Sequence, residues 1–329
     1  MSVARKVVIL GTGGTIAGQG AEQGGGVGYT AGQIDVLGLL RTMTGCGWPD
    51  GLQLEAEQVA QLDSKDMDIP TWQQLAHACA KWLDQEDVQG IVVTHGTDTL
   101  EETAWFLQSV LQPAKPVVMT CAMRPATALS ADGPANLRDA VVCALQNVPG
   151  VWVTALGEVH SAQAVRKVHP YRVHAFSSGS QGASGWVEEG QVRWGQSAPV
   201  PGAPACDVSV WRCEAAQWPW VEIVTGTAAA RPEAVDALVA AGVQGLVLAV
   251  PGNGSVHQAL QAALYRAMAR GVSVWRTTRC EQGQIVQAPG QHDPMVSVLS
   301  PVKARISLML ELLHKRAVAV NQPTAALDQ

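Results

Sequence analysis

The chain has 329 residues, of which 47% are hydrophobic and 15% are charged. This composition is typical of a folded globular protein and argues against disorder, and the length accommodates two domains. The net charge is −6 and the Lys and Arg residues are scattered, which argues against a nucleic-acid surface.

The sequence indicates neither a membrane segment nor a metal centre. No hydrophobic run approaches the length of a membrane span, and the first one, at 7–10, is too short for a signal peptide. The seven cysteines include no C-x-x-C pair, which favours reduced thiols over a disulfide framework. His169 and His174 have no cysteines at zinc-site spacing. We therefore expect a cytoplasmic protein.

Strands and helices alternate along the first part of the chain, which predicts a mainly parallel sheet flanked by helices. Residues 18–32 contain seven glycines and predict a mobile loop. In chain order we expect a strand at 7–10, helices at 34–42 and 70–83, a strand at 90–94, a helix at 98–111, a strand at 116–120, a helix within 131–148 and a strand at 151–155.

A proline-rich stretch interrupts this alternation and divides the chain. It contains Pro199, Pro201, Pro204 and Pro219 and predicts a linker at 198–219 between an N-terminal domain at 1–197 and a C-terminal domain at 220–329. The second domain is expected to hold strands at 220–225, 245–250 and 272–276 and helices at 233–241, 256–270 and 303–314. The predicted fold class is α/β, with a larger N-terminal and a smaller C-terminal α/β domain.

The first motif is a glycine-rich turn after the first strand. Residues 11–18 read Gly-Thr-Gly-Gly-Thr-Ile-Ala-Gly. A dinucleotide site needs a glycine where Ile16 stands, and a P-loop needs a lysine where Gln19 stands, so both nucleotide interpretations fail. Two interpretations stay open: a plain tight turn, or a turn whose backbone approaches a small ligand that Thr12 or Thr15 faces.

The second motif also lies where a strand runs into a helix. Residues 92–103 read Val-Val-Thr-His-Gly-Thr-Asp-Thr-Leu-Glu-Glu-Thr. In open α/β sheets ligands bind at the carboxyl ends of strands, although Thr97 or Asp98 could simply cap the helix. His95 is more typical of a structural histidine than of a catalytic base. Together the two motifs present hydroxyls at two strand ends and a carboxylate at one.

Both motifs resemble the signature segments of the bacterial-type L-asparaginase and glutaminase–asparaginase family. The segments are Thr12-Gly-Gly-Thr15-Ile-Ala-Gly18 and His95-Gly-Thr-Asp-Thr-Leu-Glu-Glu102. Further segments with similarity to the family are Ala122-Met-Arg-Pro125, Ser130-Ala-Asp-Gly-Pro134 with Asn136, Gly252-Asn-Gly254 and Lys303-Ala-Arg305. The resemblance covers nearly the whole chain, and the order and spacing of the motifs make it specific.

The resemblance implies an amidohydrolase that converts L-asparagine to L-aspartate and ammonia without a cofactor. It also implies a homotetramer, a dimer of dimers whose sites lie between the N-terminal domain of one subunit and the C-terminal domain of its partner. The implied catalytic residues are Thr15, Tyr29 of the glycine-rich loop, Thr97, Asp98 and Lys167. The implied substrate-binding residues are Ser64, Lys65, Gly96, Ala122 and Ser255.

These residue types suit amide hydrolysis, which needs a nucleophile, a proton carrier and donors for a developing oxyanion. A threonine hydroxyl attacks only when a neighbour takes its proton, and a hydroxyl–Lys–Asp set does so when the lysine is desolvated enough to be partly neutral. We expect Thr15 to attack, although the sequence leaves open which threonine does. Glycines beside both threonines are expected to expose N–H groups for the oxyanion. Taken singly, Lys167 would be a surface lysine, Tyr29 a loop aromatic and Ser64 a loop hydroxyl.

The chain departs from the family pattern at a few positions. Lys65 stands where many members carry a glutamine residue. Ser255 stands where asparagine is frequent, and its smaller side chain leaves room for glutamine as a second substrate. Residues 282–297 look shortened, and Glu281 is only a weak match for the acidic residue that the partner subunit contributes. These departures bear on substrate preference more than on reaction class.

Two other functions remain as alternatives. One is the ammonia-releasing subunit of a tRNA-dependent amidotransferase, which would normally carry extra tRNA-facing sequence. The other is a non-catalytic amino-acid-binding protein of the same fold, which has no need for Thr15, Thr97, Asp98 and Lys167 together.

Overall fold

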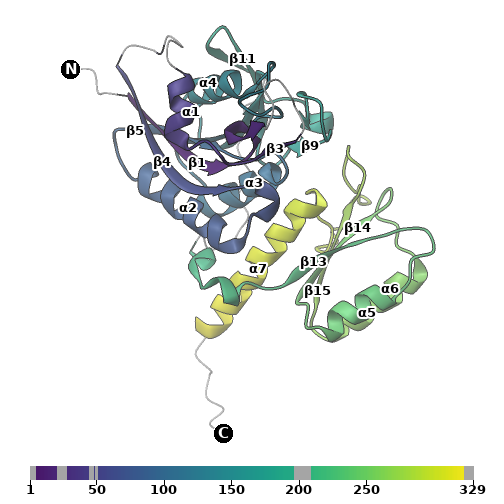
Figure 1. The fold of residues 1–329 in the computed structure, drawn as a ribbon. Helices are drawn as coiled ribbons and strands as arrows, with labels where there is room; N and C mark the ends of the chain where they lie inside the picture. Colours follow the sequence, from purple (N-terminus) through teal and green to yellow (C-terminus); the bar gives the residue numbers. More distant parts are fainter. Residues whose placement is uncertain (1–4, 21–27, 44–47, 49–50, 196–208, 322–329) are drawn as a thin grey trace. The chain divides into compact units, whose positions relative to one another are not determined.

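A computed structural model describes residues 5–20, 28–43, 48, 51–195 and 209–321 (Figure 1). The chain divides into two compact units, residues 1–203 and 204–329. Part of the expected glycine-rich loop (21–27) and part of the expected linker (198–208) lie outside the described residues. Within the described residues, no helix combines the length and the apolar character needed to cross a bilayer.

The N-terminal unit is built on an eight-stranded sheet among the described residues. Its strands lie in the order β12-β11-β8-β7-β6-β5-β1-β4, and the five from β7 to β4 are parallel to one another. The parallel strands are β1 (Arg5–Gly13), β4 (Leu52–Leu62), β5 (Val88–Thr94), β6 (Pro116–Thr120) and β7 (Gly150–Ala155). The antiparallel extension consists of β8 (Glu158–Ser161), β11 (Gly185–Glu188) and β12 (Gln191–Trp194).

Helices cover both faces of this sheet (Figure 1). They are α1 (Val36–Thr42), α2 (Ile69–Leu83), α3 (Leu100–Leu111) and α4 (Gly133–Ala144). Along β1, Val7 and Ile9 pack into the cluster that contains residues of α1 and α4, while Val8 and Leu10 are equally buried. Because successive side chains of a strand point to opposite faces, this run of buried residues marks a central strand covered on both sides.

The C-terminal unit has a parallel three-stranded sheet in the order β13-β14-β15. Leu246, Leu248 and Val250 of β14 pack with apolar residues of the helices α5 and α6. On the other face a Cβ at Gly245 would touch Leu308 of α7, so helices cover both faces. The elements are β13 (Val221–Thr225), α5 (Glu233–Ala240), β14 (Gly245–Val250), α6 (Gln258–Ala269), β15 (Ser273–Thr278) and α7 (Pro301–Asn321). The predicted α/β class with a large mainly parallel sheet and a smaller α/β unit is confirmed.

Several predictions need correction. Strand β4 was not predicted, nor were β8, β11 and β12, nor the two-stranded sheet formed by β9 (Arg166–Lys167) and β10 (Phe176–Ser177). Helix α7 runs past the predicted end at 314. Helix α3 begins at Leu100 rather than at Asp98. Part of the expected linker, from 209 onward, contains the short turns Val210–Arg212 and Ala215–Gln217, and Trp211 there is buried.

Candidate active site

Three neighbouring strands of the sheet end at the same edge. The order β4-β1-β5 places their carboxyl ends side by side. The chain adds β4 on one side of β1 and β5 on the other, so the strand order reverses between β1 and β5. Ligands of open α/β sheets bind at such a reversal. The strands lead into the turn Thr15–Ala17, into the turn Ser64–Asp66 and into the segment around Thr97. Residues far apart in sequence therefore gather at one place.

The turns that follow β1 and β5 touch through two glycines. A Cβ on Gly14 would collide with the Cα and N atoms of Gly96, and a Cβ on Gly96 would lie 2.5 Å from the hydroxyl oxygen of Ser64. Gly14 also has a φ of 79°, in the left-handed region that glycine adopts without strain. The glycines thus allow the backbones that carry Thr15, Thr97 and Ser64 to lie in van der Waals contact.

The expectation that glycine N–H groups are exposed for the oxyanion is wrong for Gly14. The N–H of Gly14 donates to the carbonyl of Leu62 at 2.9 Å, because the turn completes its pairing with the end of β4. This N–H group is therefore already used and does not serve as an oxyanion donor. The role of Gly14 is close packing.

Thr15 is paired with Tyr29. Their hydroxyl oxygens lie 2.6 Å apart in a hydrogen bond, and Thr15 is only 6% exposed. Tyr29 belongs to β3 (Tyr29–Thr30), which pairs antiparallel with β2 (Gln19–Gly20), so the described ends of the glycine-rich segment form a short ladder. A Cβ on Gly18 would lie 2.9 Å from the tyrosine ring, which explains a glycine there. The structure brings these two predicted residues together.

Thr97, Asp98 and Lys167 form a second set. The Lys167 ammonium donates to the Thr97 hydroxyl at 2.7 Å and to the Asp98 carboxylate at 2.6 Å. The lysine side chain is 15% exposed, whereas the Asp98 side chain is 56% exposed. Lys167 is therefore not a solvated surface lysine, and the outer part of the Asp98 carboxylate stays open to a cationic group of a ligand.

Ser64 is docked on the start of helix α3 by a reciprocal pair of hydrogen bonds. The N–H of Asp98 donates to its hydroxyl at 3.2 Å, and the hydroxyl of Thr99 donates to its carbonyl at 2.8 Å. Thr99 is the N-cap residue of α3, yet its side chain makes no capping hydrogen bond because it is used on Ser64. The interpretation of Thr97 or Asp98 as a simple helix cap is therefore wrong. Ser64 is buried beside Gly96 and Asp98.

His95 is a structural residue. It is fully buried, its Nδ1 donates to the Gly96 carbonyl at 2.7 Å, and its Nε2 is buried without a partner. Burial lowers the pKa of His95 to about 4, so the ring is neutral at physiological pH. A neutral ring with these contacts fixes the turn that carries Gly96.

The third sequence segment supports the site from behind. The Asp132 carboxylate accepts from the N–H groups of Met123 and Arg124, each at 2.9 Å, and Asn136 donates to the Cys121 carbonyl at 2.9 Å. Ala122 is fully buried in the core cluster that also contains Ile16. This side chain therefore packs against the Thr15 turn from within the core.

Two predicted substrate-binding residues lie in other surroundings. The Lys65 ammonium forms an ion pair with its exposed neighbour Asp66, so its charge is partly offset on the surface. Ser255 is exposed and belongs to the C-terminal unit, in the segment after β14. In the same unit, the stretch at 282–297 is tied to β15 by an ion pair of 2.6 Å between Arg276 and Asp293. Glu281 is likewise exposed in this unit.

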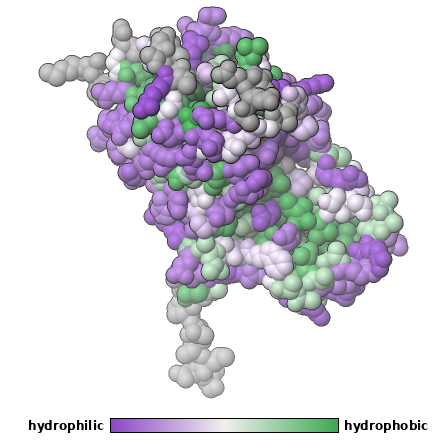
Figure 2. All heavy atoms as spheres, in the orientation of Figure 1, coloured by the Kyte–Doolittle hydropathy of each residue, from purple (hydrophilic) through white to green (hydrophobic). Residues whose placement is uncertain are grey.

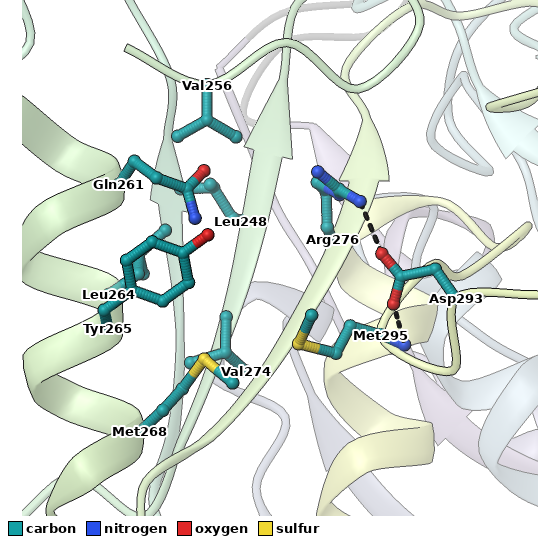
Figure 3. A pocket seen from close by; sticks show the side chains of 10 residues that line it. All are labelled: Leu248, Val256, Gln261, Leu264, Tyr265, Met268, Val274, Arg276, Asp293 and Met295. Atoms are coloured by element: carbon teal, nitrogen blue, oxygen red, sulfur yellow. Dashed lines mark hydrogen bonds and ion pairs between the residues drawn. The ribbon is translucent and has the colours of Figure 1, made fainter. Parts of the chain in front are cut away.

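A pocket of about 170 Å³ lies within the C-terminal unit (Figure 3). Gln261 and Tyr265 of α6 line one side of it, and Arg276, held by Asp293, lines the other. Hydrophobic residues gather on the surface of this unit (Figure 2), and Met268 in the pocket is 38% exposed. None of the predicted catalytic residues lines this pocket.

Sequence reasoning missed one contact of the site. The backbone N–H of Lys167 donates to the carboxylate of Glu101 at 3.2 Å. Glu101 stands in the quoted motif, but its acidic side chain at a helix start has an ordinary explanation in the helix dipole. No feature of the sequence pairs it with a residue 66 positions away.

Comparison with known proteins places the chain in a family. Residues 6–200 match the family described as "Asparaginase, N-terminal", and residues 220–320 match the "Glutaminase/Asparaginase C-terminal domain". The chain is 36% identical to the glutaminase-asparaginase of Pseudomonas fluorescens biotype A, over 93% of this chain and 86% of the relative. It is 35% identical to L-asparaginase 2 of Escherichia coli (strain K12), over 94% of this chain and 89% of the relative.

A solved structure supports the same assignment. The probable cytoplasmic L-asparaginase from Campylobacter jejuni superposes with a TM-score of 0.82 at 34% identity, covering 94% of this chain and 95% of that one. The match extends over both units and agrees with the two matched families. The chain therefore belongs to the L-asparaginase and glutaminase-asparaginase family of amidohydrolases.

Proposed function

We propose that this amidohydrolase converts L-asparagine to L-aspartate and ammonia, with Thr15 as the nucleophile and without a cofactor. The observation that carries the proposal is the pair of hydroxyl arrangements at adjoining strand ends: Thr15 with Tyr29 at 2.6 Å, and Thr97 with Lys167 at 2.7 Å. Each hydroxyl has a partner able to exchange a proton with it, as nucleophilic catalysis by threonine requires.

The steps follow from these contacts. The Thr15 oxygen attacks the side-chain amide carbon while its proton passes to the Tyr29 oxygen, and the Tyr29 hydroxyl gives its own proton to the amide nitrogen, a relay that the short hydrogen bond favours. The carbon–nitrogen bond breaks, and the leaving nitrogen departs with this proton as ammonia. Water then attacks the acyl-enzyme ester, the bond between the acyl carbon and the Thr15 oxygen breaks, the Thr97 hydroxyl held by Lys167 relays a water proton to the Thr15 oxygen, and aspartate is released.

The substrate's charged groups fit the remaining residues. The exposed part of the Asp98 carboxylate is suited to the α-ammonium group, since opposite charges attract at close range. The Ser64 hydroxyl accepts from the backbone N–H of Asp98 and keeps its own proton to donate to the α-carboxylate of the substrate. Gly96 allows Ser64 and the turn of Thr15 to pack against the segment of Thr97, and Ala122 lies in the buried cluster that contains Ile16. The exposed Ser255 of the C-terminal unit is proposed to help select the side-chain length.

Ammonia release from asparagine and from glutamine, assayed in parallel, tests the proposal. We expect turnover of asparagine with a smaller activity on glutamine, the latter because a relative with 36% identity is a glutaminase-asparaginase. Thr15→Ala and Thr97→Ala should both abolish release, and a fully active Thr15→Val would contradict the mechanism. Tight amino-acid binding without turnover would instead indicate a sensor, and ammonia release only within a tRNA-dependent complex would indicate an amidotransferase subunit.

We also propose a cytoplasmic homotetramer. Cys79, Cys121 and Cys143 are buried free thiols, as is usual in a reducing compartment. Cell fractionation and light scattering of the purified protein test these two points. A periplasmic location, as named for a Haemophilus influenzae relative, or a monomer with full activity would contradict them.

A further inference from the structure

Lys167 stands on a piece of structure that is separate from the main sheet. Its strand β9 pairs only with β10 among the described residues, through Lys167 opposite Phe176 and Arg166 opposite Ser177. A ladder of two residues a side is too short to fix its own position. The ammonium group nevertheless reaches both Thr97 and Asp98 at hydrogen-bond distance. Other contacts must therefore hold this ladder.

The first of these contacts is made by the backbone of Lys167 itself. The N–H of the next residue, Val168, donates to Ala175 across the ladder at 2.7 Å. Because successive N–H groups of a strand point in opposite directions, the N–H of Lys167 faces away from β10, at the open edge. The Glu101 carboxylate accepts from it there at 3.2 Å.

Glu101 belongs to the helix that begins at the catalytic segment. It lies in the first turn of α3, three residues after Asp98, and both carboxylates accept hydrogen bonds from Lys167. The side chain of Lys167 is thus bound by Thr97 and Asp98 while its backbone is bound by Glu101. These three contacts bind Lys167 to three of the five residues from Thr97 to Glu101.

The second attachment lies on the opposite strand of the ladder. His160 of β8 forms a hydrogen bond of 2.9 Å with the hydroxyl of Ser178, directly after β10. Both side chains are buried, and β8 is part of the main sheet. This bond fixes β10 to the sheet, whereas the bond to Glu101 fixes β9 to α3. Only the bond to Glu101 acts on Lys167 directly.

We propose that Glu101 is a positioning residue for the reaction: its carboxylate binds the backbone N–H of Lys167 and so holds the lysine ammonium on Thr97 and Asp98. The inference rests on the role proposed for Lys167 above. A long lysine side chain has many rotamers, so its ammonium is placed reliably only where its backbone is fixed. A displacement of about 1 Å at a catalytic group costs up to about 100-fold in rate.

The simpler explanation of Glu101 is a favourable charge at a helix start. Glu102 lies in the same first turn and would contribute the same charge effect. The two explanations differ in what they require of residue 101. Positioning requires a hydrogen-bond acceptor, whereas the charge effect requires an anion, and glutamine supplies the first without the second.

Steady-state hydrolysis of L-asparagine by the full-length protein tests the proposal with matched variants. Glu101→Gln and Glu101→Met have unbranched side chains of similar length, and only the glutamine keeps an acceptor. We expect Glu101→Met to lower kcat by about tenfold with KM changed less than about twofold, and Glu101→Gln to restore kcat to within about threefold of wild type. Glu102→Met serves as the charge control and should keep the wild-type kcat.

Each other outcome overturns the proposal. A wild-type kcat in Glu101→Met would show that no acceptor at 101 is needed. Equal losses in Glu101→Met and Glu101→Gln, or an equal loss in Glu102→Met, would show that the negative charge at the helix start matters and not the acceptor at 101. Thermal unfolding of every variant separates a folding defect from a kinetic one, and Glu101→Ala replaces Glu101→Met if the latter does not fold. Lys167→Ala separates the two proposals. If this variant keeps full activity, the proposed function fails. If Lys167→Ala is inactive while Glu101→Met keeps the wild-type kcat, only the role of Glu101 fails.

Discussion

Gly14 and Gly96 touch backbone to backbone, and this contact joins the two turns that carry the threonine hydroxyls. A Cβ added to Gly14 would overlap the Cα and N atoms of Gly96 and approach the carbonyl carbon of His95 to 2.8 Å. Backbone atoms at this place cannot rotate away as a flexible side chain would. The close approach of the turns therefore depends on the absence of a side chain at both positions.

Replacement of Gly14 by alanine is expected to lower the free energy of unfolding by about 3 kcal/mol or more, since it adds steric overlap to the strain of a positive φ. Gly51→Ala is the matched control. Gly51 has a φ of 80°, close to the 79° of Gly14, but nothing lies within 4 Å of its added Cβ. The control should lose only about 1 kcal/mol. Urea denaturation measures both, and equal losses would contradict the contact.

Tyr29→Phe should leave the fold intact and slow catalysis. The variant removes the oxygen that lies 2.6 Å from the Thr15 hydroxyl, and with it the proton acceptor, so we expect kcat to fall by about 100-fold. Tyr171→Phe is the control, because Tyr171 is 50% exposed and contacts Arg124 through its ring and its carbonyl. Steady-state kinetics with unchanged melting temperatures checks this. A wild-type kcat in Tyr29→Phe would exclude the hydroxyl from the reaction.

His95 should make the protein less stable in acid. Its pKa is about 4 in the folded state because of burial, against 6.5 when exposed, so the unfolded chain binds an extra proton between these values. The stability that the neutral ring provides is complete above pH 6.5 and decreases as the pH falls towards 4, by about 3 kcal/mol. The difference in unfolding free energy between wild type and His95→Gln, followed from pH 7 to 4, measures it. A pH-independent difference would contradict the assignment.

Asp139 acts in the opposite direction over part of the same range. Burial raises its pKa from 3.8 to about 6, so the folded state disfavours the ionised carboxylate. The folded protein is favoured below pH 3.8, and this advantage is lost as the pH rises through 6. Asp139→Asn should therefore stabilise the protein at pH 7.5 by about 1–2 kcal/mol, a figure reduced for its partial exposure, and give no gain at pH 3.5. Thermal unfolding at both pH values checks the sign.

Much of the helical structure follows from local sequence signals. The helix predicted at 70–83 is α2 (Ile69–Leu83), and its start is fixed by the Asp68 carboxylate, which accepts from the N–H of Thr71 at 2.9 Å. Helix α4 lies within the predicted region at 131–148, but its N-cap residue Asp132 uses its carboxylate on Met123 and Arg124 instead of on a capping hydrogen bond. A cap signal is local, but its use depends on distant partners.

The missed strands are those that local patterns describe poorly. Strand β4 alternates the apolar residues Leu52, Leu54 and Ala56 with glutamine and glutamate, a period-two signal that its polar residues obscured. It forms the edge of the sheet, where one side of a strand needs no hydrophobic cover. Strands β9 and β10 have two residues each, which is too short for any periodicity.

The sequence by itself determined which groups the site can use: glycine-rich turns after two strands, hydroxyls at residues 15 and 97, and a carboxylate at 98. Tertiary structure alone decided that β5 pairs with β1, that Tyr29 meets Thr15, and that Lys167 of β9 is bound by Glu101 at the start of α3. The reason is physical. Turn and helix signals arise from interactions between near neighbours in the chain, whereas strand order and side-chain pairing depend on hydrogen bonds and packing that form only when distant segments meet.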